Sequence, residues 1–432
     1  MKKLFYILLG LSISGYSQEI LTKNQALQSL LENNYAVKLS KNAIKTAQNN
    51  ASIYNSKYLP VLNLGAGANY SLQNQDITLQ NGTKNSFNGS ETKIYNASVG
   101  TNYPVFTGFS RKYAYKQLQE QLAISELEAK STLEKAILKT YTLYYQTAQL
   151  TENVQVLQRA LEISKQRLQR SIYQYNYGQA TKLAVLNARV DSNNDSINYI
   201  NARQVLDISK KNLLLSIGDT LTRNFRVETG VTLIDFPDLQ SLLADLPQNT
   251  DLQMMEKTLK LHDYNIQMSQ SGYLPSVGVS ASYGWNSSDN PVTSQTAELT
   301  RYGLNGGINL SWNIFDGGST KVRLQNAKIN RENQLIRREQ LQHQLQNLVS
   351  TTYYNYQNKR FVWQSQMQNL ETAEINFQRT GELFKTGRVS SVEYRQAQLN
   401  LLHAQTAILN AKYEAKIVEL QLLQLTGKLI SN

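Results

Sequence analysis

Proline is absent from two long segments of this 432-residue chain, and that absence constrains the fold more than any other feature. No proline lies between Ser110 and Phe236, or between Val292 and Asn432. Because proline breaks helices and these segments are rich in Gln, Leu, Ala, Lys and Glu, we predict exceptionally long helices there. As one helix, the stretch from Ser110 to Tyr177 would be roughly 100 Å long at about 1.5 Å per residue. The prolines are Pro60, Pro104, Pro237, Pro247, Pro275 and Pro291.

Apolar residues within these segments recur at spacings of three and four, as in a coiled-coil seam. The first segment shows this at Val154, Leu157, Leu161 and Leu168, with polar residues on the other faces. Such helices pack along narrow stripes rather than around a thick core.

Four short windows between the helical segments alternate strictly between apolar and polar residues, and none contains a charge. They are Leu62–Leu72, Tyr95–Tyr103, Val277–Asn286 and Tyr302–Ile314. This pattern predicts strands with one apolar and one wet face. A soluble β-sandwich is the alternative, but its wet face would normally carry Lys and Glu, so we favour a membrane barrel. Aromatic residues near the strand ends predict an interfacial girdle: Tyr70, Tyr103, Phe106, Tyr283, Trp285, Tyr302, Trp312 and Phe315.

The polar segments next to these windows, Gln73–Thr92 and Ser287–Thr300, are rich in Asn, Ser and Thr. We predict that both are surface-exposed loops.

The chain is a tandem repeat. Asn34–Pro60 matches Asn249–Pro275 at an offset of 215, and Gly178 matches Gly387 at an offset of 209. We predict a first repeat over 18–218, a linker over 219–248 and a second repeat over 249–432. Each repeat would contain a helix, two strands (about 61–72 and 94–106, then 276–286 and 302–315) and a long helical hairpin that turns near 178 or 387.

Four strands cannot close a membrane barrel, and lipid does not tolerate open sheet edges. Strands must therefore come from other copies of the chain. Two copies would supply eight strands, and three would supply twelve with room for a channel. The sequence thus predicts an obligate homo-oligomer.

The first residues resemble an export signal, because Lys2 and Lys3 precede an apolar run from Leu4 to Ile13. We expect a signal peptide over residues 1–17, and that apolar run is too short to span a membrane. An exported protein meets little nucleic acid, so the net charge of +12 indicates solvated surface or a partner-facing patch. The absence of Cys excludes disulfides, thiolate zinc sites and lipid attachment through an N-terminal cysteine.

A motif in the second hairpin carries a family resemblance: Phe384, Gly387 and Ser390 at intervals of three, then Glu393-Tyr394 and Ala397-Gln398. Together with the two halves, it resembles the TolC family of outer-membrane efflux proteins. The resemblance implies a mainly α homotrimer in the outer membrane of a Gram-negative bacterium. Its twelve-stranded β-barrel would continue into an α-helical barrel in the periplasm. It also implies a periplasmic adaptor protein and an inner-membrane transporter as partners, for drug efflux or type I secretion.

The same resemblance implies a periplasmic gate near the second hairpin turn. Glu393 matches the family's first acidic ring residue, and Gln396 stands where a second acid is usual. Arg388 lies one position from the family's basic residue, and Tyr394 directly follows Glu393. Glu393 either forms a ring around the pore or pairs with a nearby Lys or Arg. The adaptor-docking tips would be Gly178 and Gln179 in one turn, and Thr386 and Gly387 in the other.

No enzyme motif accompanies these features. His262, His343 and His403 lie far apart in helical segments, and neither a nucleophile elbow nor a phosphate-binding loop is present. We therefore expect a channel without catalytic activity, metal or cofactor. The alternatives are a periplasmic adaptor, which would carry one hairpin, and a structural coiled-coil protein of the envelope, which would not explain the strands.

Overall fold

The computed structural model describes residues 19–220, 223–291 and 294–430. The expected signal peptide over residues 1–17 therefore lies outside the described residues. The chain divides into two compact units, and each is considered by itself. One unit, the hairpin unit, comprises the described residues up to Asn42, Leu127–Gln253 and Gln340 onward. The other, the strand unit, comprises Ala43–Glu126 and Met254–Glu339.

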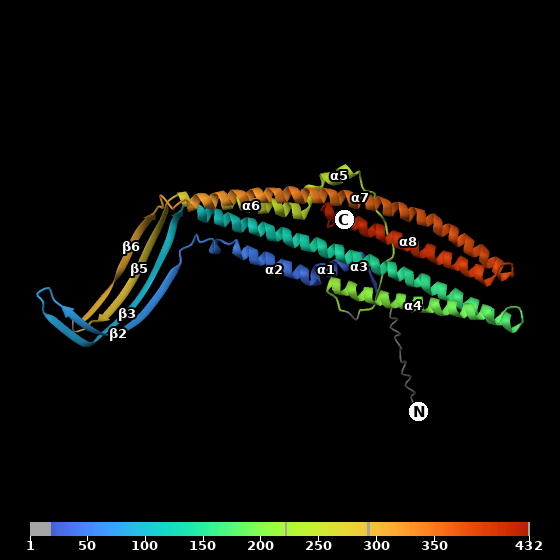
Figure 1. Cartoon of the computed structure of the whole chain (residues 1–432), viewed down its shortest axis with the longest axis horizontal. Coiled ribbons are helices and arrows are strands. Elements are labelled where there is room, and N and C mark those ends of the chain that lie inside the picture. The colour runs from blue at the N-terminus through green and yellow to red at the C-terminus, as the bar shows by residue number, and fades with distance from the viewer. Residues whose placement is uncertain (1–18, 221–222, 292–293, 431–432) are drawn as a thin grey trace, which may run out of the picture. The chain divides into compact units, whose positions relative to one another are not determined.

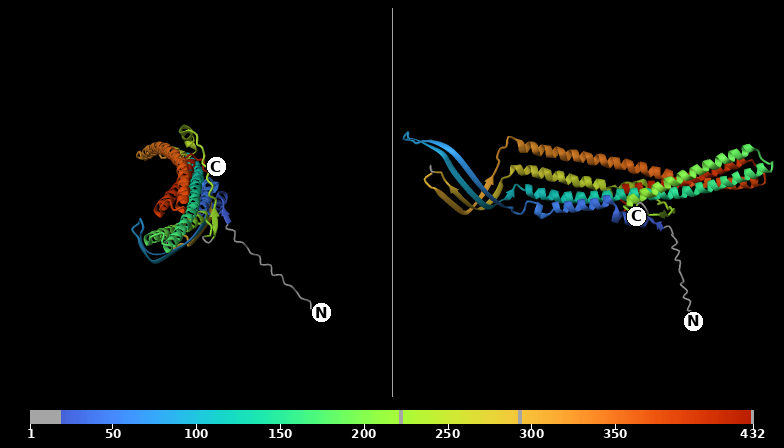
Figure 2. Two further views of the ribbon diagram at one scale, coloured as in Figure 1. Left: turned by 90° about the vertical axis from the view of Figure 1, so that its right-hand side faces the viewer. Right: turned by 90° about the horizontal axis from the view of Figure 1, so that it is seen from below.

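The long helices predicted within the proline-free segments are present. α3 (Ser110–Asn176) and α7 (Ser319–Lys385) have 67 residues each, and both contribute to the two units. α4 (Lys182–Ile217) returns from α3, and α8 (Ser391–Leu425) returns from α7. Within the hairpin unit the two hairpins lie side by side near their turns (Figures 1 and 2). None of the helices in the described part of the chain is long and apolar enough to cross a membrane.

The strand unit contains an antiparallel sheet in the order β2-β3-β5-β6, and all four strands are visible in Figure 1. The strands are β2 (Leu62–Thr78), β3 (Lys84–Thr107), β5 (Ser276–Asp289) and β6 (Glu298–Ser311). Pairing keeps the alternating apolar residues in line, since Val99 lies opposite Tyr283, which lies opposite Leu304. Among the described residues β2 and β6 each have one paired neighbour, so both edges of the sheet are open.

The strands are longer than the alternation predicted, and the loop prediction for Gln73–Thr92 was wrong over most of its length. β2 continues to Thr78 and β3 begins at Lys84, with Thr78 paired to Lys84 and Gln75 to Phe87. The loop predicted for Ser287–Thr300 is likewise strand at both ends. The reason is that backbone pairing extends a ladder without needing an apolar face. Polarity alone therefore does not mark the end of a strand.

Shorter elements complete the two units. The hairpin unit has a parallel pair formed by β1 (Glu19–Leu21) and β4 (Phe225–Val227), and its apolar core includes Leu30, Tyr144 and Leu213. The remaining elements are α1 (Lys23–Asn33), α2 (Tyr35–Asn50), α5 (Leu239–Ala244), α6 (Thr250–Gln270), and the 3-10 turns Ile53–Asn55, Leu246–Gln248 and Ser271–Tyr273.

An extended segment of the linker, Glu228–Phe236, is held by side chains of the long helices, and we call it the strap. Lys416 Nζ donates to Thr232 O at 2.8 Å, and Ile234 N donates to Glu419 Oε2 at 2.8 Å. Lys416 and Glu419 also pair with each other at 2.5 Å, and the Glu419 side chain is fully buried. A buried ion pair thus anchors a backbone that lacks regular hydrogen bonding of its own.

The corners between strands and long helices are built alike in the two halves. Tyr103 Oη donates to Tyr58 O at 2.8 Å, and Trp312 Nε1 donates to Tyr273 O at 3.1 Å. In the first half, Arg111 lies over the rings of Tyr58 and Tyr103. Its guanidinium also donates to three backbone carbonyls, of which Pro104 O is the nearest at 2.7 Å. Arg111 therefore holds the first corner together.

Candidate functional site

The two hairpin turns have the same construction. Gly178 and Gly387 take φ values of 73° and 75°, in the left-handed region. Gln179 N donates to Gln174 O at 2.7 Å, and Arg388 N donates to Leu383 O at 2.9 Å. This closure of a helix end favours glycine for its backbone conformation. A Cβ at either glycine would meet nothing within 4 Å, so the constraint is the φ angle rather than space.

Glu393, predicted to form a ring or to pair with Lys or Arg, forms a capping box at the start of α8. Its Oε2 accepts from Ser390 N at 2.7 Å and from Ser390 Oγ at 2.8 Å, while Glu393 N donates to Ser390 Oγ at 3.2 Å. The Ser390 backbone bond, with the hydroxyl bond, lowers the pKa of the Glu393 carboxyl below its usual value. The carboxylate is exposed and ionised, and within one chain its partner is the helix cap.

Tyr394 stacks between two phenylalanines of α7. Its ring is parallel to that of Phe384 at 4.7 Å and near-parallel to that of Phe377 at 5.4 Å. Arg170 of α3 lies over the Phe384 ring at 4.9 Å and donates to Lys385 O at 2.9 Å. A side chain of the first hairpin thereby satisfies a carbonyl at the end of α7, which has no partner within its own helix.

The other predicted gate residues are exposed. Gln396 donates to Asn400 Oδ1 at 2.9 Å along the surface of α8, and Arg388 lies in the turn. The structure thus brings Tyr394 into a cluster with the first hairpin, whereas Glu393, Gln396 and Arg388 face solvent in one chain.

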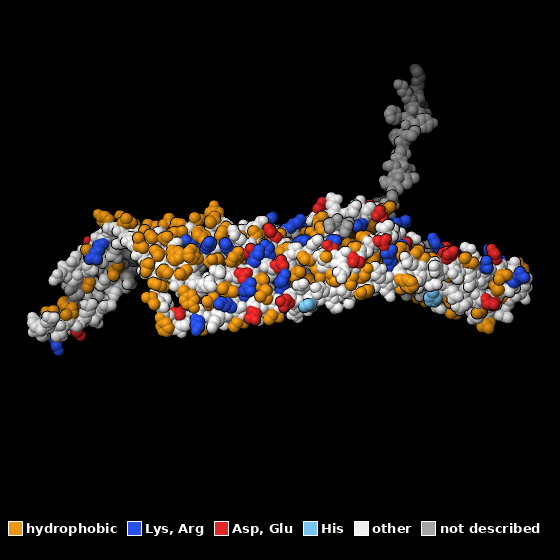
Figure 3. Space-filling model, turned by 90° about the horizontal axis from the view of Figure 1, so that it is seen from above, with side chains coloured by type: hydrophobic (Ala, Val, Ile, Leu, Met, Phe, Trp, Pro, Cys, Tyr) orange, Lys and Arg blue, Asp and Glu red, His pale blue; other side chains and the backbone are white. Residues whose placement is uncertain are grey.

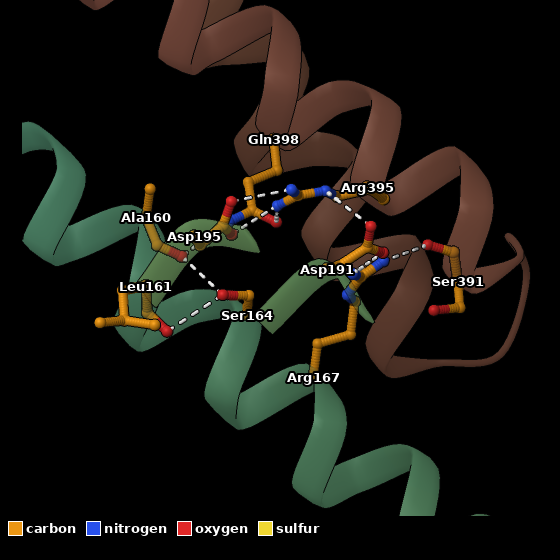
Figure 4. A network of polar contacts seen from close by, with 9 residues as sticks. All are labelled: Ala160, Leu161, Ser164, Arg167, Asp191, Asp195, Ser391, Arg395 and Gln398. Atoms are coloured by element: carbon orange, nitrogen blue, oxygen red, sulfur yellow. Dashed lines mark hydrogen bonds and ion pairs between the residues drawn. The ribbon is translucent and has the colours of Figure 1, made fainter. Parts of the chain in front are cut away.

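A charged network next to these turns was missed by the sequence reasoning (Figure 4). Arg395 of α8 holds Asp195 of α4 at two points, Nη1 to Oδ2 at 2.7 Å and Nη2 to Oδ1 at 2.9 Å. Arg167 of α3 pairs with Asp191 of α4, whose carboxylate also lies 3.8 Å from Arg395 Nε. We call these four residues, Arg167, Asp191, Asp195 and Arg395, the clasp.

Neutral groups extend the clasp across both hairpins. Arg167 donates to Ser391 O at 3.3 Å, Arg395 donates to Gln398 Oε1 at 3.0 Å, and Gln398 Nε2 donates to Ala160 O at 2.9 Å. The clasp therefore joins α3 and α4 of the first hairpin to α8 of the second. One sequence signal could have found it: Asp191 and Asp195 lie one turn apart on the same face of α4.

The clasp is balanced in charge, with two arginines and two aspartates; Arg167, Asp195 and Arg395 are largely buried, and the Asp191 side chain is 28% exposed. Arg167 and Asp195 are 4% and 3% exposed. Burial by itself would lower the pKa of Arg395, but the hydrogen bond and charge of Asp195, with the charge of Asp191, raise it. Because a buried charge is stable only while its partner remains, the two hairpins cannot separate here without exposing or neutralising Arg395 and Asp195, whereas Arg167 and Asp191 belong to the same hairpin and can stay paired.

The sheet register places the predicted girdle aromatics at two levels. Tyr103 and Phe106 lie on β3 at the helix-side end, opposite Val279 and Val277. Toward the other end, Trp285 lies directly opposite Tyr302. The members with the most exposed side chains are Tyr70, Tyr283, Tyr302, Trp312 and Phe315, whereas Tyr103 and Phe106 are half-buried.

In the described part of the chain, no group of His, Asp and Glu side chains is placed to hold a metal ion. His262, His343 and His403 are not brought together there.

The family model for outer membrane efflux protein matches residues 26–219 and 244–428. The chain belongs to this family. It is 24% identical to the outer membrane protein TolC of Escherichia coli over 441 residues, covering 99% of this chain and 87% of that protein. It is 22% identical to the probable outer membrane lipoprotein SilC of Salmonella typhimurium, covering 92% and 84%.

Solved structures support the same assignment of fold. The Campylobacter jejuni CmeC outer membrane channel superposes with a TM-score of 0.79 at 18% identity, covering 94% of this chain and 86% of that one. CusC gives a TM-score of 0.78 at 16% identity, covering 94% and 92%. This chain is thus an outer-membrane channel protein of a Gram-negative bacterium, as the motif around Glu393 indicated.

Proposed function

We propose that three copies of this chain form a passive exit duct across the outer membrane. Each copy would contribute four strands to a twelve-stranded barrel, with its helices forming an α-helical barrel in the periplasm. The observation that carries this is the sheet with uncharged strand centres and two open edges, β2 and β6. In a bilayer those edges need partners, and further copies of the same sheet supply them.

Exposed apolar stripes on the long helices support assembly from identical copies. On α7, Val322, Ile329 and Ile336 are spaced by seven and each is more than half exposed. On α4, Leu183, Val190 and Ile197 repeat the same spacing and are equally exposed. Spacing by seven favours packing against another helix, and neighbouring copies would cover both stripes.

The duct would be organised as two tandem repeats, 18–218 and 249–432, preceded by a signal peptide and joined by the linker 219–248. Its membrane band would carry the aromatic girdle, whose two levels in the register suit the two interfaces of a bilayer. Transport through it involves no bond chemistry, and the energy would come from an inner-membrane transporter.

The gate would lie where the clasp holds α8 against the first hairpin. Opening requires α7 and α8 to move away from α3 and α4, so the Arg395–Asp195 pair would set the cost of that motion. Three Glu393 carboxylates around the axis would form a single acidic ring that attracts cations, with Tyr394 packed behind it and Gln396 and Arg388 nearby. Single-channel recording tests the ring: unchanged conductance and unchanged cation block in Glu393→Ala would rule it out.

A periplasmic adaptor would dock at the hairpin tips, through Gly178 and Gln179 in one turn and Thr386 and Gly387 in the other. Because the chain has no cysteine, single cysteines at Gln179 and Thr386 allow clean crosslinking to a co-expressed adaptor. An adduct at either tip supports docking. If neither tip gives an adduct while the adaptor is present, the result counts against docking at the tips.

The duct itself is tested by extraction and reconstitution. We expect the protein in the outer-membrane fraction, released only by detergent, with a trimer mass and a stepwise conductance in planar bilayers. Recovery from the soluble periplasm without detergent would contradict the proposal and favour an adaptor or a coiled-coil scaffold.

A further inference from the structure

The uncharged centres of the strands lie between two rims of very different charge. At the rim next to the long helices, the charged residues are five bases, Lys57, Arg111, Lys112, Lys321 and Arg323, and one acid, Asp316. At the far rim, acids and bases are mixed: Asp76, Lys84, Glu91, Lys93, Asp289, Glu298 and Arg301. On the face seen in Figure 3, blue and red side chains are scarce over the strands between these rims.

Two members of the helix-side rim have structural roles of their own. Arg111 is half-buried and bound to backbone carbonyls and tyrosine rings, as described above. Asp316 accepts from Thr320 N at 2.7 Å and from Thr320 Oγ1 at 2.6 Å at the start of α7. Arg323 Nη2 also lies 3.9 Å from Asp316 Oδ2, so the charge of the single acid at this rim is offset by an arginine of the same rim.

The three lysines differ in this respect. Lys57, Lys112 and Lys321 are exposed, and none forms an ion pair with a carboxylate in the described part of the chain. Lys112 and Lys321 are the third residues of α3 and α7, and they are related by the same offset of 209 that relates Gly178 to Gly387. A cation in the first turn opposes the helix dipole, so helix stability does not explain these two lysines.

Exposed apolar side chains lie within a few residues of Lys57 and Lys321 in the sequence, at the ends of the strands. Tyr54, Ile314 and Phe315 are each 83% exposed, and Trp312 is 55% exposed. An apolar and aromatic belt bordered by flexible lysines fits the boundary of a bilayer, where the stems lie along the acyl chains and the ammonium groups reach the headgroups. Net positive charge on that border is complementary to anionic headgroups.

We propose that Lys57, Lys112 and Lys321 form a collar that binds the phosphate headgroups of anionic phospholipids in the periplasmic leaflet. The assignment of this rim to the periplasmic side rests on the proposed function. The ligand class is an anionic glycerophospholipid within a bilayer, such as phosphatidylglycerol. Three copies of the chain would place nine such lysines around the barrel.

The test uses the full-length trimer in vesicles of phosphatidylcholine, with and without phosphatidylglycerol. We compare wild type, a collar variant (Lys57→Gln, Lys112→Gln, Lys321→Gln) and a far-rim variant with equal charge loss (Lys84→Gln, Lys93→Gln, Arg301→Gln). Phosphatidylglycerol should raise the thermal midpoint of wild type and of the far-rim variant but not of the collar variant. Phosphatidylglycerol retained after detergent extraction should fall about fivefold for each collar lysine removed.

Several outcomes would overturn the proposal. They are an equal response of the two variants, no phosphatidylglycerol response in wild type, or the same midpoint shift from inorganic phosphate. If the triple glutamine variant does not fold, the single changes Lys57→Gln, Lys112→Gln and Lys321→Gln decide, because each should lose part of the phosphatidylglycerol response, and an unchanged response in all three would overturn the proposal. Conductance in pure phosphatidylcholine reports on the duct alone, so failure of the collar is distinguishable from failure of the channel.

Discussion

Arg395 on α8 and Asp195 on α4 form a two-point ion pair in which the Asp195 side chain is only 3% exposed. No other charged contact of the clasp has this bidentate geometry. Its two residues belong to different halves of the chain, 200 positions apart. The pair is therefore the point at which the two hairpins are most specifically joined.

We expect Asp195→Ala to destabilise the hairpin unit by about 3–5 kcal/mol, because it leaves Arg395 buried without its main partner. The double change Asp195→Leu with Arg395→Met removes both charges and should recover most of that loss. Urea unfolding monitored by far-UV circular dichroism measures the free energy of unfolding of both variants. A double variant as unstable as the single one would show that the charges themselves are required.

The same pair should control opening. Arg395→Ala is expected to raise the open probability of single channels, since α8 loses its hold on the first hairpin. Arg379→Ala removes an exposed arginine of α7 and serves as the control, with unchanged recordings expected. If the two variants have the same open probability, the clasp does not control channel opening.

The capping box predicts a pH effect at the start of α8. The pKa of Glu393 is lowered in the folded chain, so its contribution is present above the unfolded pKa and is lost as pH falls through the folded pKa. The difference in thermal midpoint between wild type and Glu393→Gln should therefore be largest near neutral pH and vanish under strongly acidic conditions. A difference that stays constant with pH would contradict this.

Replacing two nearby glycines of the second hairpin by alanine should change the stability of the chain in opposite directions. Gly387→Ala places a side chain at φ 75° and should cost about 1–2 kcal/mol. Gly381→Ala lies inside α7, where the new Cβ would be 3.5 Å from Tyr394, an ordinary contact. Better helix propensity should then stabilise the chain by about 0.5–1 kcal/mol. Thermal melts of the two variants check both signs.

The strap depends on its buried anchor. Glu419→Ala removes the acceptor of Ile234 N and leaves Lys416 buried without its carboxylate partner. We expect a loss of about 3–5 kcal/mol and faster proteolysis within Glu228–Phe236. Glu414→Ala removes an exposed carboxylate paired with Lys359 and should change neither measurement appreciably. Cleavage equal in the two variants would show that the pair does not hold the strap.

Periodicity revealed much of the architecture in advance. Missing prolines and two isolated glycines indicated α3, α4, α7 and α8, and strict alternation indicated the centres of the four strands. The strand ends were not foreseeable in this way. Beyond Gln73 the residues have no apolar face, and only the backbone pairing of β2 with β3 shows that the strands continue.

The site was less accessible from the sequence. The family motif located Glu393 and Tyr394, but it could not show that Ser390 N donates a hydrogen bond to the Glu393 carboxylate. The clasp was missed because its members come from three helices, and the one-turn spacing of Asp191 and Asp195 does not reveal which residues pair with them. Only folding brings Arg167 and Arg395 to the two aspartates of α4.

The hairpin formed by β2 and β3 closes through the turn around Gly82, where Gly82 N donates to Leu79 O at 2.9 Å. It is longer than the hairpin formed by β5 and β6, and a Cβ at Gly82 would meet nothing within 4 Å. In the trimer proposed above, three such hairpins would stand above the cell surface. They would be the part of the protein first met by antibodies and phages, and the natural place to insert an epitope tag.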